Sequence, residues 1–318
     1  STHVNIFHAI SATNGGAIDM SALTSVSGPT YETIDRLAFI VDSGGAIDLS
    51  SLATTNSGSG MVRFDVRDTS GGAFTLPSLV TSDDAEFIVA SGLTADLGTA
   101  GTPASQSGGA YTLADGAIVN YTPLTTLQWT SIDLAINSEL HVPNVVDISG
   151  SNVTLAPGRV FDTGVIGTLD NARIAVTGGV NWGVATGDLS ATSYSCVGLT
   201  GAYTIFSASD PGSVLDLSTI NSINAAHSTH VNLLYSVKAS NGGAIDLSGL
   251  TNVSGPTYEV VDRIEFVVES GGTIDLSNLA TTTSGAGKVR FDVRDTSGGP
   301  FALPSLQTSN DAEFIVAG

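Results

Sequence analysis

Hydrophobic and polar residues alternate in short segments along the whole chain. In the segment AIDLSSL at 46–52, Ile47 and Leu49 fall on one face and Asp48 on the other, which is the period of two that a β-strand imposes. A second alternating segment precedes such blocks, as in LAFIV at 37–41 and IEFVV at 264–268. Helical periodicity of 3.6 residues is almost absent. The pattern therefore predicts an all-β chain of short strands.

The alternating block recurs along the chain and defines a short repeat of roughly 21–30 residues. Its clear versions are GGAIDMSAL at 15–23, GGAIDLSSL at 44–52, GGAFTLPSL at 71–79, GSVLDLSTI at 212–220, GGAIDLSGL at 242–250, GGTIDLSNL at 271–279 and GGPFALPSL at 298–306. The glycine pair indicates one bend, since positive φ angles cost glycine little. A second bend follows from Pro77, Pro143 and Pro304, which share one position in the repeat and cannot donate to a sheet ladder.

Short strands, two bends and this repeat length predict one coil of a parallel β-helix (β-solenoid) per repeat. Stacked coils would bury one inward column made of Ile18, Ile47, Phe74, Leu215, Ile245, Ile274 and Phe301. A second column would contain Met20, Leu49, Leu76, Leu217, Leu247 and Leu276. With coils about 4.8 Å apart, roughly 12 of them are expected. A globular β-sandwich is the alternative, but it explains neither the matching residue types nor the repeat.

A longer repeat contains the short one. Residues 1–91 and 228–318 align without a gap at an offset of 227, and 65 of the 91 aligned positions are identical. We therefore predict that 1–227 is one complete unit, with irregular coils at 146–210, and that 228–318 starts a second copy continuous with the first. Because the second copy stops partway, we expect a longer array in which coils continue end to end with further copies.

Net charge restricts the partners. The formal charge is −20, from 30 acidic and 10 basic residues, so nucleic acid and insertion into a membrane are not expected. Divalent cations fit this charge better. Because 42% of the residues are hydrophobic and periodically placed, the charge does not indicate disorder. Cys196 is the only cysteine, so an intrachain disulfide is excluded, and we expect it to be buried.

Acidic residues occupy one outward position of the repeat. Successive members of this column should lie about 5 Å apart, where like charges repel each other. A calcium ion between coils would relieve the repulsion, and so would screening by solvent; both alternatives stay open. The candidate calcium ligands are Asp19, Asp48, Asp216, Asp246 and Asp275.

Arginine and aspartate residues form another recurring group. Arg63, Asp65, Arg67 and Asp68 return as Arg290, Asp292, Arg294 and Asp295. Alternation places the first three on one outward strip, which predicts a ladder of exposed ion pairs that fixes the register of the strands. An arginine site for an acidic sugar is the alternative interpretation.

Aromatic residues mark the irregular segment 146–210. One interpretation of Trp182, Tyr194 and Tyr203 is a ligand-contacting patch or an interface between neighbouring β-helices. The simpler interpretation is a set of degenerate coils with ordinary core aromatic residues.

Catalytic patterns are weak, so we predict that the protein is not an enzyme. The adjacent carboxylates Asp83 and Asp84 become Asn310 and Asp311 in the second copy, so this pair is not kept. His3 and His230 are equivalent positions, which favours a structural role, and His227 with His230 is only a weak candidate metal pair. A polysaccharide lyase or hydrolase remains the less favoured alternative.

The blocks GGAIDLSSL, GGAIDLSGL and GGTIDLSNL, with their alternating FIV and FVV strands, resemble repeats of secreted bacterial surface proteins. The nearest comparison is with filamentous-haemagglutinin-like adhesins and giant repeat surface proteins. The resemblance covers about two thirds of the chain and is weak at 146–210. It implies a right-handed β-helix and an extracellular or cell-surface shaft, fibre, sheath or stalk that stacks coils. A module that binds glycans or surfaces is the alternative function, and the resemblance implies no catalytic residues.

Overall fold

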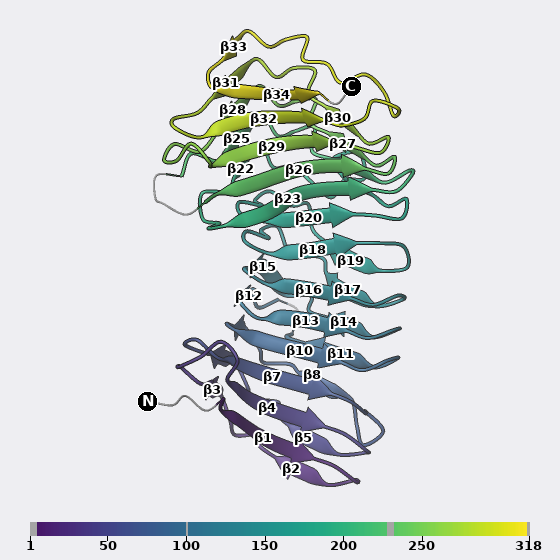
Figure 1. Cartoon of the computed structure of the whole chain (residues 1–318). Coiled ribbons are helices and arrows are strands. Elements are labelled where there is room, and N and C mark those ends of the chain that lie inside the picture. Colours follow the sequence, from purple (N-terminus) through teal and green to yellow (C-terminus); the bar gives the residue numbers. More distant parts are fainter. Residues whose placement is uncertain (1–4, 100, 228–231, 317–318) are drawn as a thin grey trace. The chain divides into compact units, whose positions relative to one another are not determined.

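The protein is an all-β parallel β-solenoid of about 12 turns (Figure 1). The computed structural model describes residues 5–99, 101–227 and 232–316, and every regular element in these ranges is a strand. The described residues therefore include no apolar helix long enough to cross a membrane. The predicted fold class is confirmed. The right hand that the resemblance implies stays a prediction.

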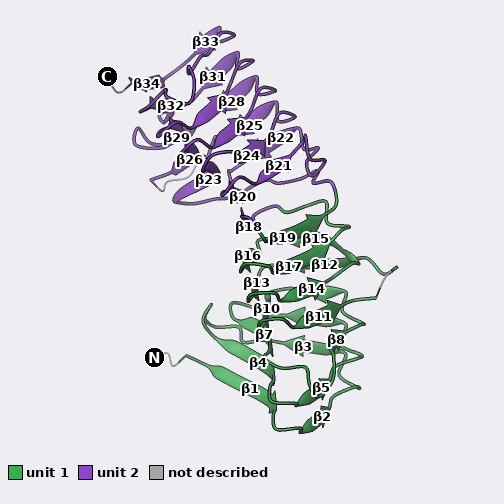
Figure 2. Cartoon of the chain, turned by 90° about the vertical axis from the view of Figure 1, so that its right-hand side faces the viewer, with its two compact units in different colours: residues 1–148, 158–164 green, residues 149–157, 165–318 purple. Residues whose placement is uncertain are grey.

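Two compact units make up the chain, residues 1–148 with 158–164 and residues 149–157 with 165–318 (Figure 2). In each unit a regular coil contributes one strand to each of three faces, and neighbouring coils pair in parallel. The boundary of these units differs in position from the predicted repeat boundary at residue 227, and the repeat boundary itself stays a prediction.

In the first unit, the first face has the strand order β1 (Phe7–Ala12), β4 (Arg36–Val41), β7 (Met61–Val66), β10 (Ala85–Val89), β13 (Ala110–Leu113) and β16 (Ser131–Leu134). The second face holds two separate sheets, β2 (Ala17–Asp19) with β5 (Ala46–Asp48), and β8 (Phe74–Leu76), β11 (Thr94–Leu97), β14 (Ile118–Asn120), β17 (Glu139–Val142) and β19 (Val160–Thr163). The third face has β3 (Ser25–Ser27), β6 (Thr54–Asn56), β9 (Thr81–Ser82), β12 (Ala104–Ser107) and β15 (Leu124–Gln128).

In the second unit, the first face has β18 (Asn152–Leu155), β20 (Arg173–Val176), β23 (Ala202–Ser209), β26 (Leu234–Ser240), β29 (Arg263–Val268), β32 (Lys288–Val293) and β34 (Ala312–Val316). The second face has β21 (Asn181–Gly183), β24 (Val214–Asp216), β27 (Ala244–Asp246) and β30 (Thr273–Asp275). The third face has β22 (Ser193–Ser195), β25 (Ser222–Asn224), β28 (Asn252–Ser254), β31 (Thr281–Thr283) and β33 (Thr308–Ser309).

Stacked side chains fill the core beneath the first face. Phe39, Phe64, Phe87 and Tyr111 occupy one register on successive strands, and their ring centroids are 5.5, 5.2 and 5.2 Å apart. Each such contact contributes about 0.5–1.5 kcal/mol beyond the burial of apolar surface. Because each ring packs on the coils before and after it, no coil buries its apolar face alone.

The predicted inward columns are confirmed over most of their length. Ile18 faces Ile47 in register, and Leu215, Ile245 and Ile274 face one another on three successive strands. The bends at proline are confirmed as well, since Pro77 and Pro143 follow directly on β8 and β17 and lie in turns.

The columns were predicted to stack in register from coil to coil. At Phe74 and Phe301 this stacking is interrupted, and there the prediction was wrong. Phe74 is buried, but the sheet that contains Ile47 ends at β5, and β8 starts a separate sheet. Phe301 is only half-buried and lies outside any strand. The third coil of each copy is therefore displaced from the ladder on the second face.

A change of turn accounts for the displacement. In regular coils the residue before the glycine pair and the first glycine both have positive φ, as at Ser43 (49°) and Gly44 (76°). In the third coil it is the second glycine that is left-handed, Gly72 at 148° and Gly299 at 151°.

A carboxylate then takes the place of a main-chain carbonyl. The N–H of Gly15 donates to the carbonyl of Ser43 at 3.0 Å, whereas the N–H of Gly44 donates to Oδ2 of Asp68 at 2.5 Å. The second copy repeats this exchange, since Gly271 donates to Oδ2 of Asp295 at 2.6 Å.

Candidate functional site

The acidic column is formed as predicted on the second face of each unit. Asp19 is paired in register with Asp48 in the first unit. In the second unit Asp216, Asp246 and Asp275 follow one another on β24, β27 and β30. Neighbouring α-carbons along each column are therefore one coil spacing apart, about 4.8 Å.

Each aspartate of the column caps the turn that follows its strand. One carboxylate oxygen accepts the N–H two residues further on, at 2.8–3.0 Å, from Ser21, Ser50, Ser218, Ser248 and Ser277. This is an Asx turn, which an Asp-x-Ser sequence favours. At Asp19 the hydroxyl of Ser21 donates as well, and its hydrogen bond lowers the pKa of that carboxyl.

The turns give these carboxylates a structural role that the sequence analysis did not assign. Among the residues that the structure describes, no group of three or more His, Cys, Asp or Glu side chains is placed to hold a metal ion. Ca²⁺ takes six to eight oxygen ligands. One oxygen of each carboxylate is already engaged by the backbone, and at Asp216 both are, since Oδ2 also accepts the N–H of Ala185 at 2.8 Å. The calcium column stays a prediction.

The arginine strip connects three successive coils in the first unit. Nε of Arg36 on β4 and Nε of Arg63 on β7 both donate to Oε2 of Glu86 on β10, at 3.0 and 2.7 Å. Arg67 pairs with the buried carboxylate of Asp65 at 2.6 Å, and this hydrogen bond raises the pKa of the guanidinium. Glu86 was not among the residues predicted from the sequence. Aligning Phe64 with Phe87, which are register partners, would have placed Glu86 beside Arg63.

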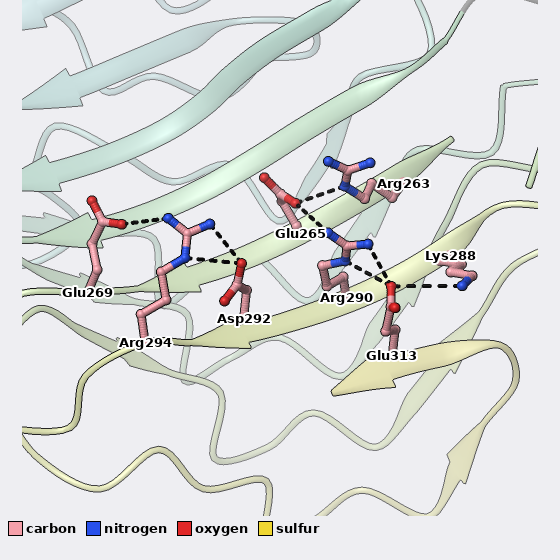
Figure 3. Close-up of polar contacts among 8 residues, drawn as sticks. All are labelled: Arg263, Glu265, Glu269, Lys288, Arg290, Asp292, Arg294 and Glu313. Carbon is pink, nitrogen blue, oxygen red and sulfur yellow. Dashed lines mark hydrogen bonds and ion pairs between the residues drawn. The ribbon is translucent and has the colours of Figure 1, made fainter. Parts of the chain in front are cut away.

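The second copy elaborates the same strip (Figure 3). Arg290 on β32 lies between Glu265 on β29, at 3.8 Å, and Glu313 on β34, at 2.8 Å. Glu265 stands where the first copy has Ala38, and its Oε2 accepts a hydrogen bond from Nε of Arg263 at 2.9 Å. The residue that joins three coils has thus changed from a glutamate to an arginine.

A separate group of ion pairs crosses three coils of the second unit, those of β26, β29 and β32. Arg294 donates to Asp292 and to Glu269, both at 2.8 Å (Figure 3), and Glu269 also binds Lys238 at 2.7 Å. The hydrogen bond from Lys238 is the largest cause of the lowered pKa of Glu269. Since these cations already have carboxylate partners, an acidic sugar would have to displace one of them. The geometry therefore favours the register-fixing ladder over an anion site.

Asp68 and Asp295 do not belong to the arginine strip, although they are adjacent to it in sequence. Their carboxylates accept hydrogen bonds from Ser70 and Gly44, and from Ser297 and Gly271. The bond from the serine hydroxyl is the largest cause of the lowered pKa of each carboxyl.

The aromatic residues of the irregular segment are mostly core residues. Trp182 and Tyr194 are buried, and the hydroxyl of Tyr194 donates to the carbonyl of Ala172 at 2.9 Å. Tyr203 is half-buried and lies 5.0 Å below the guanidinium of Arg173, a cation–π contact. The burial of Trp182 and Tyr194 favours coils with core aromatic residues over a ligand patch, and the patch stays a prediction because Trp182 also lines a hollow of about 280 Å³. Cys196 is buried, as expected, and burial raises its pKa.

A histidine joins two carboxylates on neighbouring coils, a bridge that the sequence did not predict. His141 on β17 contacts Glu139 through Nε2 at 2.7 Å and Asp162 on the next coil through Nδ1 at 3.2 Å. Burial lowers the pKa of the imidazole, but the hydrogen bonds to the two carboxylates outweigh this effect and the pKa is raised. His227 is buried, whereas His3 and His230 lie outside the described residues.

Comparison of the chain with protein-family models, with curated proteins and with solved structures gives no match.

Proposed function

We propose that the protein is a non-enzymatic structural repeat protein, a shaft or fibre built from stacked β-solenoid coils. The observation that supports this most directly is the carboxylate of Glu86, which ties three successive coils together on their outer surface. The equivalent network in the second copy is larger, with Arg290 at its centre. Ion pairs that cross coils oppose sliding of one coil over the next, in addition to the main-chain ladder.

End-to-end association with further copies is part of this proposal. The first coil exposes Ile6 and Phe7 by 40% and 56%, whereas Leu233, the equivalent of Ile6, is fully buried by the coil before it. At the other end Phe314 is 55% exposed, although its equivalent Phe87 is 1% exposed beneath β13. Open strand edges with apolar side chains favour addition of another coil.

We further propose that the protein lies outside the cell or on its surface, because its repeats resemble those of bacterial surface proteins. The experiment is electron microscopy of the native protein, with antibody labelling of intact cells. Filaments or rods on the cell surface are expected. A native protein seen only inside cells, or as compact particles whose dimensions do not grow with the number of 227-residue units, would contradict the proposal.

Association of the ends has a separate test. Sedimentation velocity of this chain at rising concentration should show end-to-end oligomers. Replacing Phe7 with lysine should reduce them, because the exposed edge of β1 then carries a charge. The matched control is Val165→Lys, since Val165 is 50% exposed and lies outside the strands. If the two variants associate equally, end-to-end association is contradicted, whereas the proposed shaft or fibre function is not.

A further inference from the structure

A hollow lies beside the same coil in both copies. In the first unit it has a volume of about 300 Å³ and is lined by Ala46, Ile47, Asp48, Leu49, Ala73 and Thr75. In the second unit the volume is about 510 Å³, and the lining includes the six residues found 227 positions later, Thr273, Ile274, Asp275, Leu276, Pro300 and Ala302. The recurrence shows that the hollow belongs to the repeat.

Each hollow exposes the edge of a strand. On β5 the N–H of Ala46 and the carbonyl of Asp48 point to the preceding coil, where they bind Gly16 and Met20. Alternation in a parallel ladder then directs the N–H and C=O of Ile47 to the following coil. In a regular coil Leu247 donates to the carbonyl of Asp275. Within the described residues, the corresponding bond from Leu49 to Thr75 is not formed.

The sequence of the second copy maintains this open edge. Pro300 occupies the position where Thr273, one coil earlier, donates its N–H to the carbonyl of Gly243 at 3.0 Å. Proline has no N–H, so Pro300 cannot make this bond to Gly272. Asp295 and the left-handed Gly299 hold the preceding turn in its altered form. The first copy has the same turn and the same gap with Ala73 in place of Pro300.

The chemistry of the hollow is apolar at its floor and acidic at its rim. Ile47 and Ile274 are 9% and 7% exposed, whereas Ile245, at the equivalent position of a regular coil, is 1% exposed. Asp48 and Asp275 stand on the rim, each with only Oδ1 engaged in its Asx turn. Neither lining contains a lysine, an arginine or an aromatic ring.

We propose that each hollow binds a short extended peptide segment of a basic partner protein by β-strand addition. The backbone of the peptide pairs with the free edge at Ile47 or Ile274. Its apolar side chains cover these isoleucines, and an alternating lysine or arginine reaches Asp48 or Asp275. The acidic rim of each hollow, which no lysine or arginine of the lining neutralises, attracts a basic segment. A glycan is disfavoured because the lining lacks an aromatic ring on which a sugar would stack.

The test is fluorescence anisotropy of the full chain with the labelled peptide Val-Lys-Val-Lys-Val at low salt. We expect binding, and about tenfold weaker binding to the double variant Asp48→Asn with Asp275→Asn, since each hollow then loses its charge-assisted contact. Methylation of alternate peptide nitrogens should weaken binding to a similar extent, because it removes donors to the strand edge. The matched control Asp133→Asn changes an exposed aspartate on the first face and should leave binding unchanged.

Several results would overturn the proposal. They are the lack of binding, equal binding of Val-Glu-Val-Glu-Val, or an affinity insensitive to nitrogen methylation. If self-association of the chain excludes the peptide, the occupant of the hollow is a second copy and not a basic partner. A neutral oligosaccharide that displaces the peptide would replace it by a glycan. Because the hollow exists with or without filament formation, failure here leaves the structural function untouched.

Discussion

Glu86 accepts a hydrogen bond from Arg36, although the two residues lie on strands separated by a whole coil. Arg63, on the intervening strand, donates to the same carboxylate oxygen, and all three side chains are largely shielded from solvent. A partly buried carboxylate with two cations contributes more than an exposed pair, for which about 0–1 kcal/mol is usual.

The first prediction concerns this shared carboxylate. Glu86→Gln should lower the free energy of unfolding by about 1–3 kcal/mol, because two partly buried guanidinium groups lose their counter-charge. Urea denaturation followed by circular dichroism measures the change. Asp133→Asn, at an exposed position on the same face, is the control and should have little effect. Equal effects of the two substitutions would show that the bridge adds nothing to stability.

The second copy predicts a smaller effect at its additional glutamate. Glu265→Ala restores the residue of the first copy, and Arg263 and Arg290 can then share Glu313 as Arg36 and Arg63 share Glu86. We expect a loss below about 1 kcal/mol in the same urea experiment. A loss larger than that of Glu86→Gln would mean that the two networks do not interconvert in this way.

Proline substitutions distinguish the open strand edge from a regular one. Ala73→Pro should be tolerated, since Pro300 stands at the equivalent position and the turn before it is the same. Ala46→Pro should cost about 3 kcal/mol or more, because the N–H of Ala46 donates to Gly16 at 2.9 Å. Thermal unfolding of both variants measures the difference. Similar melting temperatures would contradict the break in the ladder.

His141 predicts a pH dependence. Since its pKa is raised in the folded chain, the bridge stabilises below the ordinary histidine value of 6.5, and this contribution is lost as pH rises through the folded pKa. The wild type should therefore lose more stability than His141→Asn between pH 5.5 and 8.5. His8→Asn, at an exposed position of β1, is the control and should follow the wild type. If the stability of wild type and of His141→Asn changes equally with pH, the His141 bridge does not contribute to stability.

Removal of divalent cations tests the acidic column. Because each carboxylate holds its own Asx turn, we expect EDTA to leave the melting temperature unchanged. A fall in melting temperature that added calcium reverses, and that Asp246→Asn abolishes, would instead support the predicted calcium site.

The alternation of apolar residues and the repeated blocks were sufficient to predict the coils. The altered turn before Phe74 and the ion pairs of Glu86 were not predicted, for physical reasons. Ile18 and Ile47 could be aligned because both are inward residues of blocks that share the sequence GGAID. Phe74 belongs to a block that looks similar, yet the carboxylate of Asp68 alters the turn before it, and alternation carries no information on turns. Glu86 was missed for another reason, since ion pairs across coils depend on the register of strands more than 20 residues apart.

The turn at Asp68 has a consequence for how such a chain can change. A main-chain carbonyl, such as that of Ser43 beside Gly15, has a fixed position in its coil. The carboxylate of Asp68 is on a rotatable side chain, so it reaches the equivalent N–H of Gly44 from a backbone path of a different length. Coils of unequal residue number can therefore be neighbours here while the first and third faces keep their register. Insertions and deletions that would disrupt the array elsewhere should accumulate at this joint.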